Sequence, residues 1–338
     1  MSTKERQSNF ELLRIVAMLF IVCHHLVIKG ADTCGYVTPY TYEKDGLIGI
    51  FINSFVVGGV NLFVLISGYF GIRKLIQPLL KLGIDLVVYG LIAYILGVLF
   101  LHIDFSISGM AHGIDLHNWF VIHFALLILM SPILESALQG QTSKTLQKWI
   151  FLLMIINVVF GYILGYVNIN GYNYLNFILL YVMSRYIRVL KEEHHKFSET
   201  ISKYSFWGYV LSAFLLVAGV IILYYSGHFH HSDKYFGYNN PLILLSAFAL
   251  FCYFSSLKIQ SKTINTIATG MFGVFLMHTP PEIIPIRNQY SSVIFKSYGY
   301  AGLMLEAVCL FVILTFISIF IEQFNKKIVK HIYAIIKK

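Results

Sequence analysis

Long apolar stretches recur along the whole chain, from Phe10 to Ile321, and only short polar segments separate them. A helix needs about 20 mostly apolar residues to cross the hydrocarbon core of a bilayer. The chain is therefore predicted to be an all-α, polytopic integral membrane protein with about ten transmembrane helices. These spans are expected at 10–29, 47–70, 79–101, 117–138, 149–167, 173–190, 205–225, 240–257, 267–285 and 300–323.

The amino-acid composition excludes a soluble domain. Of the 338 residues, 57% are hydrophobic and 12% are charged, whereas soluble domains are about 45–50% apolar and about 25% charged. The short gaps between spans also exclude a globular head on a single anchor. We expect two parts: a transmembrane domain, 1–324, and a basic amphipathic cytoplasmic tail, 325–338, that lies on the anionic inner leaflet.

Lys and Arg residues indicate which loops face the cytoplasm, because cytoplasmic loops carry an excess of them. If ten spans alternate and both termini are cytoplasmic, nineteen of the 25 basic residues fall on the inner side and five on the outer side. The remaining one is Arg14, inside the first span. The net charge of +9 thus reflects topology, and no nucleic-acid partner is predicted.

The first span carries the costliest polar residues, since an ionisable group in a bilayer costs at least about 2.5–3.5 kcal/mol. Arg14 and His25 are separated by eleven residues, about 20° from three full turns, so they share one helix face about 16 Å apart. His24 lies about 80° from that line. A guanidinium suits phosphate binding and an imidazole suits proton transfer. The alternative is that Arg14 snorkels to the inner interface and both histidines lie at the outer one.

Other polar residues within the spans are candidates for lining a cavity. They are Asn61, Ser67, Asp85, His278 and Glu306. His278 is followed by Thr279 and a Pro-Pro pair, which must kink or end the helix. Irregular backbone of this kind is typical of a cavity wall, although a tolerated break near the outer interface is the alternative.

Metal binding and disulfides are not indicated by the sequence. Four cysteines lie far apart without a CxxC spacing. The HFHH run at 228–231 lacks the helical spacing and the carboxylates of a metal site, so neutral loop histidines are the simpler interpretation.

Two segments resemble the membrane acyltransferase-3 family. In the segment NFELLRIVAMLFIVCHH, the family's first-helix pattern of an Arg, a small residue and a His falls on Arg14, Ala17 and His25. The segment GGVNLFVLISGYFGIRK, which ends at Lys74, resembles the family's glycine, hydrophobic stretch with Phe, Ser-Gly-aromatic and basic residues. Weaker similarity at 119–134, 181–190 and 272–281 extends the resemblance over nearly the whole chain.

The resemblance implies an O-acyltransferase of a cell membrane, with the bacterial plasma membrane as the expected location. The enzyme would move an acetyl or other acyl group from cytoplasmic acetyl-CoA to a hydroxyl of an extracytoplasmic or lipid-linked surface glycan. Acetyl-CoA would be a co-substrate, with no bound cofactor and no metal. The basic residues expected to bind its phosphates are Arg14, Arg73, Lys74, Arg185 and Arg188. The family's second arginine after Arg73 is missing, which leaves bidentate phosphate recognition there in question.

Catalysis is expected at His25, either as a general base or as a transient acyl carrier. Asp45, the acidic residue of the first outer loop nearest the second span, is expected to orient its ring. The expected partners are acyl-CoA, the glycan acceptor and the bilayer, and the sequence specifies no oligomeric state.

An alternative function is a transporter or flippase of a glycan or small solute, with Arg14, Asp85, His25 and Glu306 along its path. Transporters commonly show internal hydropathy symmetry, and this sequence shows no repeat. A sensor or scaffold without catalysis is a third possibility.

Overall fold

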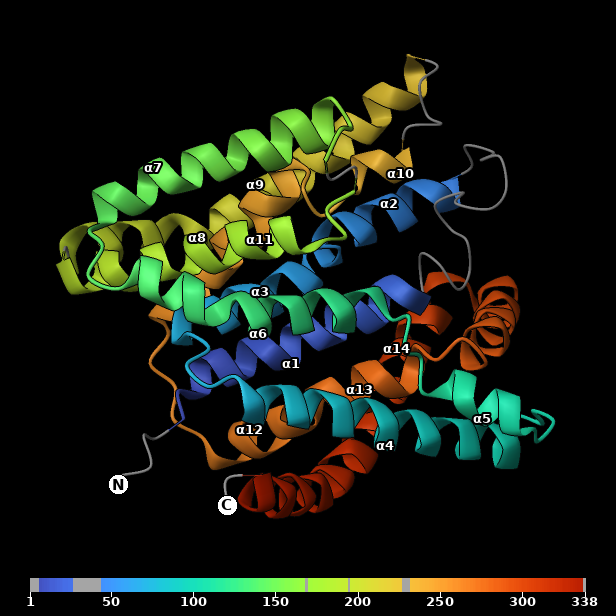
Figure 1. The fold of residues 1–338 in the computed structure, drawn as a ribbon. Helices are drawn as coiled ribbons and strands as arrows, with labels where there is room; N and C mark the ends of the chain where they lie inside the picture. The colour runs from blue at the N-terminus through green and yellow to red at the C-terminus, as the bar shows by residue number, and fades with distance from the viewer. Residues whose placement is uncertain (1–5, 27–43, 168–169, 194, 227–231, 337–338) are drawn as a thin grey trace.

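The computed structural model describes residues 6–26, 44–167, 170–193, 195–226 and 232–336, and this part of the chain is helical without a β-strand (Figure 1). The elements are α1 (Ser8–Cys23), α2 (Lys44–Val56), α3 (Gly59–Phe70), α4 (Ile76–Phe100), α5 (Ile107–Gly113), α6 (Trp119–Leu138), α7 (Ser143–Met154), η2 (Ile155–Ile163), α8 (Tyr174–Glu193), α9 (His195–Tyr225), α10 (Ser232–Tyr235), α11 (Pro241–Ser256), α12 (Lys262–Ile267), η4 (Ala268–Gly270), α13 (Met271–His278) and α14 (Ile283–Ile336).

Seven helical segments of the described chain are long and apolar enough to cross a membrane. They are Ser8–Leu26, Gly46–Phe70, Ile76–Phe100, Trp119–Leu138, Ser143–Ile163, Glu199–Leu223 and Ile283–Ile336. The prediction of an all-helical, multi-pass membrane protein is thus confirmed. The other three predicted spans fall on α8, α11 and the α12 to α13 segment, which are shorter or more polar, so the count of ten stays a prediction.

Two breaks in the helices have clear sequence causes. α13 ends at His278, just before the Pro-Pro pair, as the missing backbone donors predict. Within α14 the helix is kinked at Gly299, where φ is 60° and ψ is −154°. This left-handed region is accessible to glycine because glycine has no Cβ. The last predicted span, at 300–323, begins directly after this kink.

Helix α1 lies inside the bundle, packed against α3, α11, α13 and α14 (Figure 1). The approach to α3 is close, because a Cβ added at Gly59 would lie only 2.9 Å from the carbonyl oxygen of Ala17. At its far end α1 widens into a π-helical turn over residues 24–26. Such turns are frequent at functional sites, and this one contains both His24 and His25.

The first described residues, before α1, and the end of α14 lie at the same end of the bundle (Figure 1). Hydrogen bonds join helix ends there: the backbone N–H of Ser143 donates to the Glu193 carboxylate at 3.1 and 3.2 Å, and the N–H of Ser261 donates to Ser8 Oγ at 3.0 Å. The start of α7 therefore lies beside the end of α8, and the start of α12 beside the start of α1. These are all segments that the basic residues predict to be cytoplasmic.

The predicted tail is continuous with α14, which runs without a break from Asn325 to Ile336. Asn325 is buried and its amide donates to Asp85 Oδ1 at 3.0 Å, so the beginning of the tail is packed against α4. The predicted domain boundary after residue 324 thus falls inside a helix.

Candidate functional site

A pair of histidines lies at the end of the bundle opposite the termini. His25 Nδ1 is 2.9 Å from Nε2 of His278, which ends α13, and the two ring centroids are 5.1 Å apart. His278 is buried and His25 is half-buried. The helix break after His278 therefore places this side chain against the residue that the sequence singled out on α1.

The hydrogen bonds of His278 favour one tautomer of the neutral pair. Its Nδ1 lies 2.6 Å from the carbonyl oxygen of Val274, and a carbonyl oxygen only accepts, so Nδ1 must carry the hydrogen. In neutral His278 the Nε2 is then an acceptor, and Nδ1–H of His25 donates to it. When His25 is neutral as well, its Nε2 carries the lone pair, the form that a general base or a nucleophile requires.

The neighbouring groups support this arrangement. Arg287 Nη1 donates to the carbonyl oxygen of His278 at 2.8 Å and holds the end of α13 in place. His24 points elsewhere: its Nδ1 lies 2.8 Å from Asn53 Oδ1 on α2, as its angle on the helix indicated. Asp45 lies in the first turn of α2, but its side chain is outside the described part of the chain.

A basic cavity of about 850 Å³ lies at the other end of α1. We use this name for the space lined by Arg6, Arg14, Arg73, Arg188 and Lys191 together with Glu11 and Glu192. Arg14 Nη1 donates to both carboxylate oxygens of Glu11 at 2.8 and 2.9 Å, so this guanidinium is held in position. With five cations against two carboxylates, the cavity favours a ligand with several negative charges.

The structure brings together three of the five predicted donor-binding residues. Arg14, Arg73 and Arg188 line the basic cavity, whereas Lys74 is exposed and is not among its described lining residues. Arg185 instead forms an ion pair with Glu135 beside Gly71.

Two residues of the basic cavity, Arg6 and Lys191, were not singled out from the sequence. Both lie just outside predicted spans, where basic residues are expected on topological grounds alone. Their charge and their position next to a span were the only available signals.

A second, smaller cavity of about 310 Å³ extends from Arg14 into the bundle. Ser67 and Asp85, two of the residues proposed from the sequence to line a cavity, are in its wall. Asp85 is also buried in an ion-pair cluster, because Lys81 Nζ lies 2.6 Å from Asp85 Oδ2 and 2.9 Å from Glu322 Oε2. This pairing offsets the cost of burying the charges, so for Asp85 a structural role is sufficient.

Between this smaller cavity and the histidine pair, the described side chains leave a gap of about 10 Å³. It is lined by Met18, Ile21, Val60, Phe63, Phe120 and Phe275. Phe63 also lines the 310 Å³ cavity, and Phe275 packs edge-on against His278 with the ring centroids 6.1 Å apart. Aromatic side chains thus separate the basic cavity from the histidines along α1.

The remaining predicted cavity residues have different surroundings. Asn61 is buried, and its amide donates to the carbonyl oxygen of Tyr238, which ties α3 to the segment before α11. Glu306 accepts a hydrogen bond from Ser291 Oγ at 2.9 Å and lines a mostly apolar cavity of about 570 Å³ beside His278.

The protein is helical and multi-pass, with a basic cavity at one end of the bundle and a partly buried histidine pair at the other. These are the parts of a membrane-embedded group-transfer enzyme. The sequence profile of the acyltransferase-3 family, described as an acyltransferase domain, matches residues 7–323. The chain therefore belongs to this family and is a membrane acyltransferase. Comparisons with curated proteins and with solved structures give no match.

Proposed function

We propose that this protein transfers an acetyl group from acetyl-CoA, bound on the cytoplasmic side, to a hydroxyl of an extracytoplasmic or lipid-linked surface glycan. One observation carries the proposal: the basic cavity and the His25–His278 pair lie at opposite ends of the same helix, α1. A charged donor and a hydroxyl acceptor could therefore approach one reaction centre from opposite sides of a membrane. Family membership supports acyl transfer, and the cavity charge supports a phosphorylated donor.

The tautomer of the pair suits the chemistry. The acceptor hydroxyl gives its proton to Nε2 of His25 as its oxygen attacks the thioester carbonyl, and His278 Nε2 accepts the Nδ1–H of the resulting imidazolium. The new C–O bond replaces the C–S bond, and the proton passes to the departing thiolate. The same lone pair could instead attack the thioester first, which would give a transient acyl-imidazole.

Direct transfer can be tested with the purified protein in nanodiscs, incubated with acetyl-CoA labelled in the acetyl group and with surface glycan from a strain that lacks the gene. We expect label in base-labile esters on the glycan, and no label with the His25→Ala protein. Movement of unmodified glycan or solute across the bilayer without ester formation would instead support a transporter or flippase.

The membrane orientation can be tested by labelling single introduced cysteines in cells, with Cys34 and Cys309 replaced by serine. A membrane-impermeant reagent should reach His112→Cys and Ser292→Cys in intact cells. It should reach Gln141→Cys, Glu193→Cys and Lys330→Cys only after permeabilisation, because these positions belong to the predicted inner segments. Labelling of Glu193→Cys in intact cells would contradict the proposed orientation.

His278 is proposed to act as a positioning residue for His25. His278→Ala should lower kcat about 10- to 100-fold, since an unpaired buried group costs about 1–3 kcal/mol and 1.36 kcal/mol corresponds to tenfold in rate. The KM for acetyl-CoA should not change, because the basic cavity lies at the other end of α1.

His278→Gln is the matched variant for this prediction, because its amide oxygen can take the place of Nε2 as acceptor. It should recover part of the lost kcat. An equal loss in His278→Gln and His278→Ala, or a rise in donor KM with unchanged kcat, would contradict the positioning role.

A further inference from the structure

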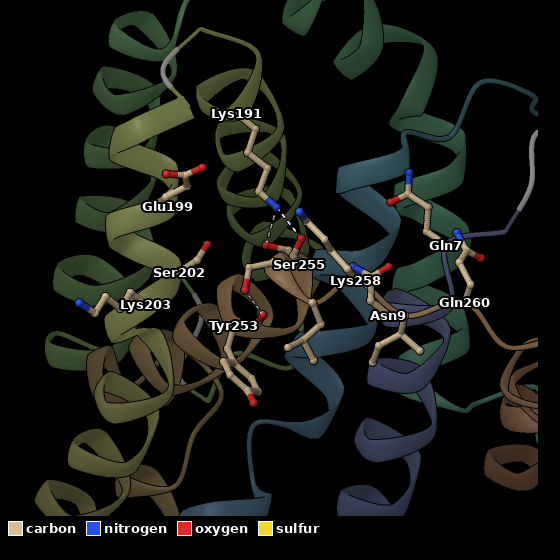
Figure 2. Close-up of a pocket in the computed structure, with 13 residues that line it drawn as sticks. Gln7, Asn9, Lys191, Glu199, Ser202, Lys203, Tyr253, Ser255, Lys258 and Gln260 are labelled. Atoms are coloured by element: carbon tan, nitrogen blue, oxygen red, sulfur yellow. Dashed lines mark hydrogen bonds between the residues drawn. The ribbon is translucent and has the colours of Figure 1, made fainter.

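Another cavity, drawn in Figure 2, adjoins the basic cavity. We call it the lysine cavity. Its volume is about 950 Å³. Its walls come from the start of α1, the end of α8, part of α9, the end of α11 and the segment that follows α11. Three lysines, Lys191, Lys203 and Lys258, line it together with one carboxylate, Glu199. The lysine cavity thus also favours an anionic ligand.

The two cavities share Gln7 and Lys191 in their walls. Lys191 Nζ donates to the carbonyl oxygen of Ser255 at 2.6 Å and to its Oγ at 2.9 Å, which fixes the ammonium group at the shared wall (Figure 2). An ammonium has three N–H donors, and Lys191 Nζ also lies 5.9 Å from the ring centroid of Tyr69 in the wall of the basic cavity, so this cation lies at the boundary of the two spaces. Because the two spaces meet at these side chains, one long ligand can occupy both.

The other two lysines differ in direction. In Figure 2 Lys258 extends toward the middle of the lysine cavity, whereas Lys203 extends away from it. Lys203 Nζ lies 5.5 Å from the ring centroid of Tyr204, which gives this cation a partner outside the cavity. Lys258 and Lys191 are therefore the cations that a ligand in the lysine cavity would meet.

The uncharged part of the wall suits a flat heterocycle. Tyr253, Leu257 and Ile259 supply aromatic and aliphatic surface, and the side-chain amides of Gln7 and Gln260 supply donors and acceptors. Nucleobases bind proteins by stacking on such surfaces and by hydrogen bonds to the edges of their rings. The lining thus combines an apolar surface for a nucleobase with cations for a phosphate.

We propose that the two cavities form one bipartite site for a CoA thioester, an inference that rests on the proposed function. The lysine cavity takes the 3′-phosphorylated adenosine, with Lys258 and Lys191 on the 3′-phosphate. The basic cavity takes the diphosphate, with Arg14, Arg73 and Arg188 as its cations. An acyl donor without a nucleotide, such as an acyl phosphate, would need only one of the two cavities.

The course of α1 indicates which part of the CoA thioester lies in which cavity. Arg14 lines the basic cavity and Asn9 lines the lysine cavity. At about 1.5 Å per residue, His25 lies about 16 Å along the axis from Arg14 but about 24 Å from Asn9. The thioester must reach His25, so the pantetheine arm leaves from the basic cavity and the nucleotide occupies the space farther from the reaction.

The test compares equilibrium binding of CoA and 3′-dephospho-CoA, which needs no acceptor, to the purified full chain in phosphatidylcholine nanodiscs. The wild-type protein should bind CoA about tenfold more tightly, because the 3′-phosphate contacts two cations. Lys258→Ala should reduce this ratio to about threefold or less and leave the affinity for dephospho-CoA nearly unchanged. Lys262→Ala removes an exposed lysine of α12 that is not among the described lining residues, so it should keep the wild-type ratio.

Each other outcome has a definite meaning. Equal affinities of the wild-type protein for the two compounds, or an equal loss for both in Lys258→Ala, would overturn the bipartite site while leaving acetyl-CoA as the donor. Loss of the CoA preference in nanodiscs that contain phosphatidylglycerol would show that a lipid phosphate occupies the lysine cavity, and would also overturn it. Absence of binding of either compound by the folded wild-type protein would overturn the proposed function itself.

Discussion

His25→Ala should eliminate measurable glycan acetylation in a protein that still folds and inserts. A positioned base contributes about 10²–10⁴-fold to a rate, and Nε2 of His25 is the nitrogen that carries the lone pair in the pair with His278. Acetyl-ester content of the surface glycan and label transfer by the purified protein measure this loss. Binding of CoA should persist, because the basic cavity lies at the other end of α1.

His24→Ala is the matched control, one residue away on the same helix. His24 contacts Asn53, and removing it should cost about 1–3 kcal/mol of stability because a buried amide loses its partner. Activity per folded molecule should nevertheless remain a measurable fraction of wild type. An inactive His24→Ala protein beside an active His25→Ala protein would show that the reaction centre does not include His25.

Arg14→Ala should weaken CoA binding about 10- to 100-fold. A charge-assisted hydrogen bond contributes about 1.5–3 kcal/mol. Arg14 lines both the basic cavity and the smaller cavity leading into the bundle, as Arg6 also does, and Arg14 is the one of the two that lies within α1. Equilibrium binding and the KM for acetyl-CoA measure the effect. Unchanged donor affinity and activity would remove Arg14 from the donor site.

Two controls separate donor binding from the loss of the Arg14–Glu11 ion pair. Glu11→Gln removes the carboxylate partner but keeps the guanidinium, so it should retain most of the donor affinity. Lys234→Ala removes a cation at the opposite end of the bundle, where Nζ donates to the carbonyl oxygen of Ile163, and should leave donor binding unchanged. A loss in Glu11→Gln as large as that in Arg14→Ala would assign the effect to the structure of α1.

The sequence alone predicted the helical membrane class, because the bilayer imposes a length and an apolarity on every spanning segment. It also predicted that Arg14 and His25 share one helix face, since that prediction uses only the α-helical repeat. The end of α13 at His278 could also be predicted from nearby residues, because two prolines follow it closely in the chain. Each of these features is set by residues close together in the chain.

Only the tertiary structure paired His25 with His278, which are 253 residues apart, and so showed that Nδ1 is the nitrogen of His25 that faces the partner ring. It likewise directed Arg185 to Glu135 and away from the basic cavity, and it brought Arg6 and Lys191 into that cavity. Charge and hydropathy assign a residue to a side of the membrane, but every basic residue near the inner interface has the same signal. Which of them face one another depends on how the helices pack, and packing is decided by contacts between distant segments.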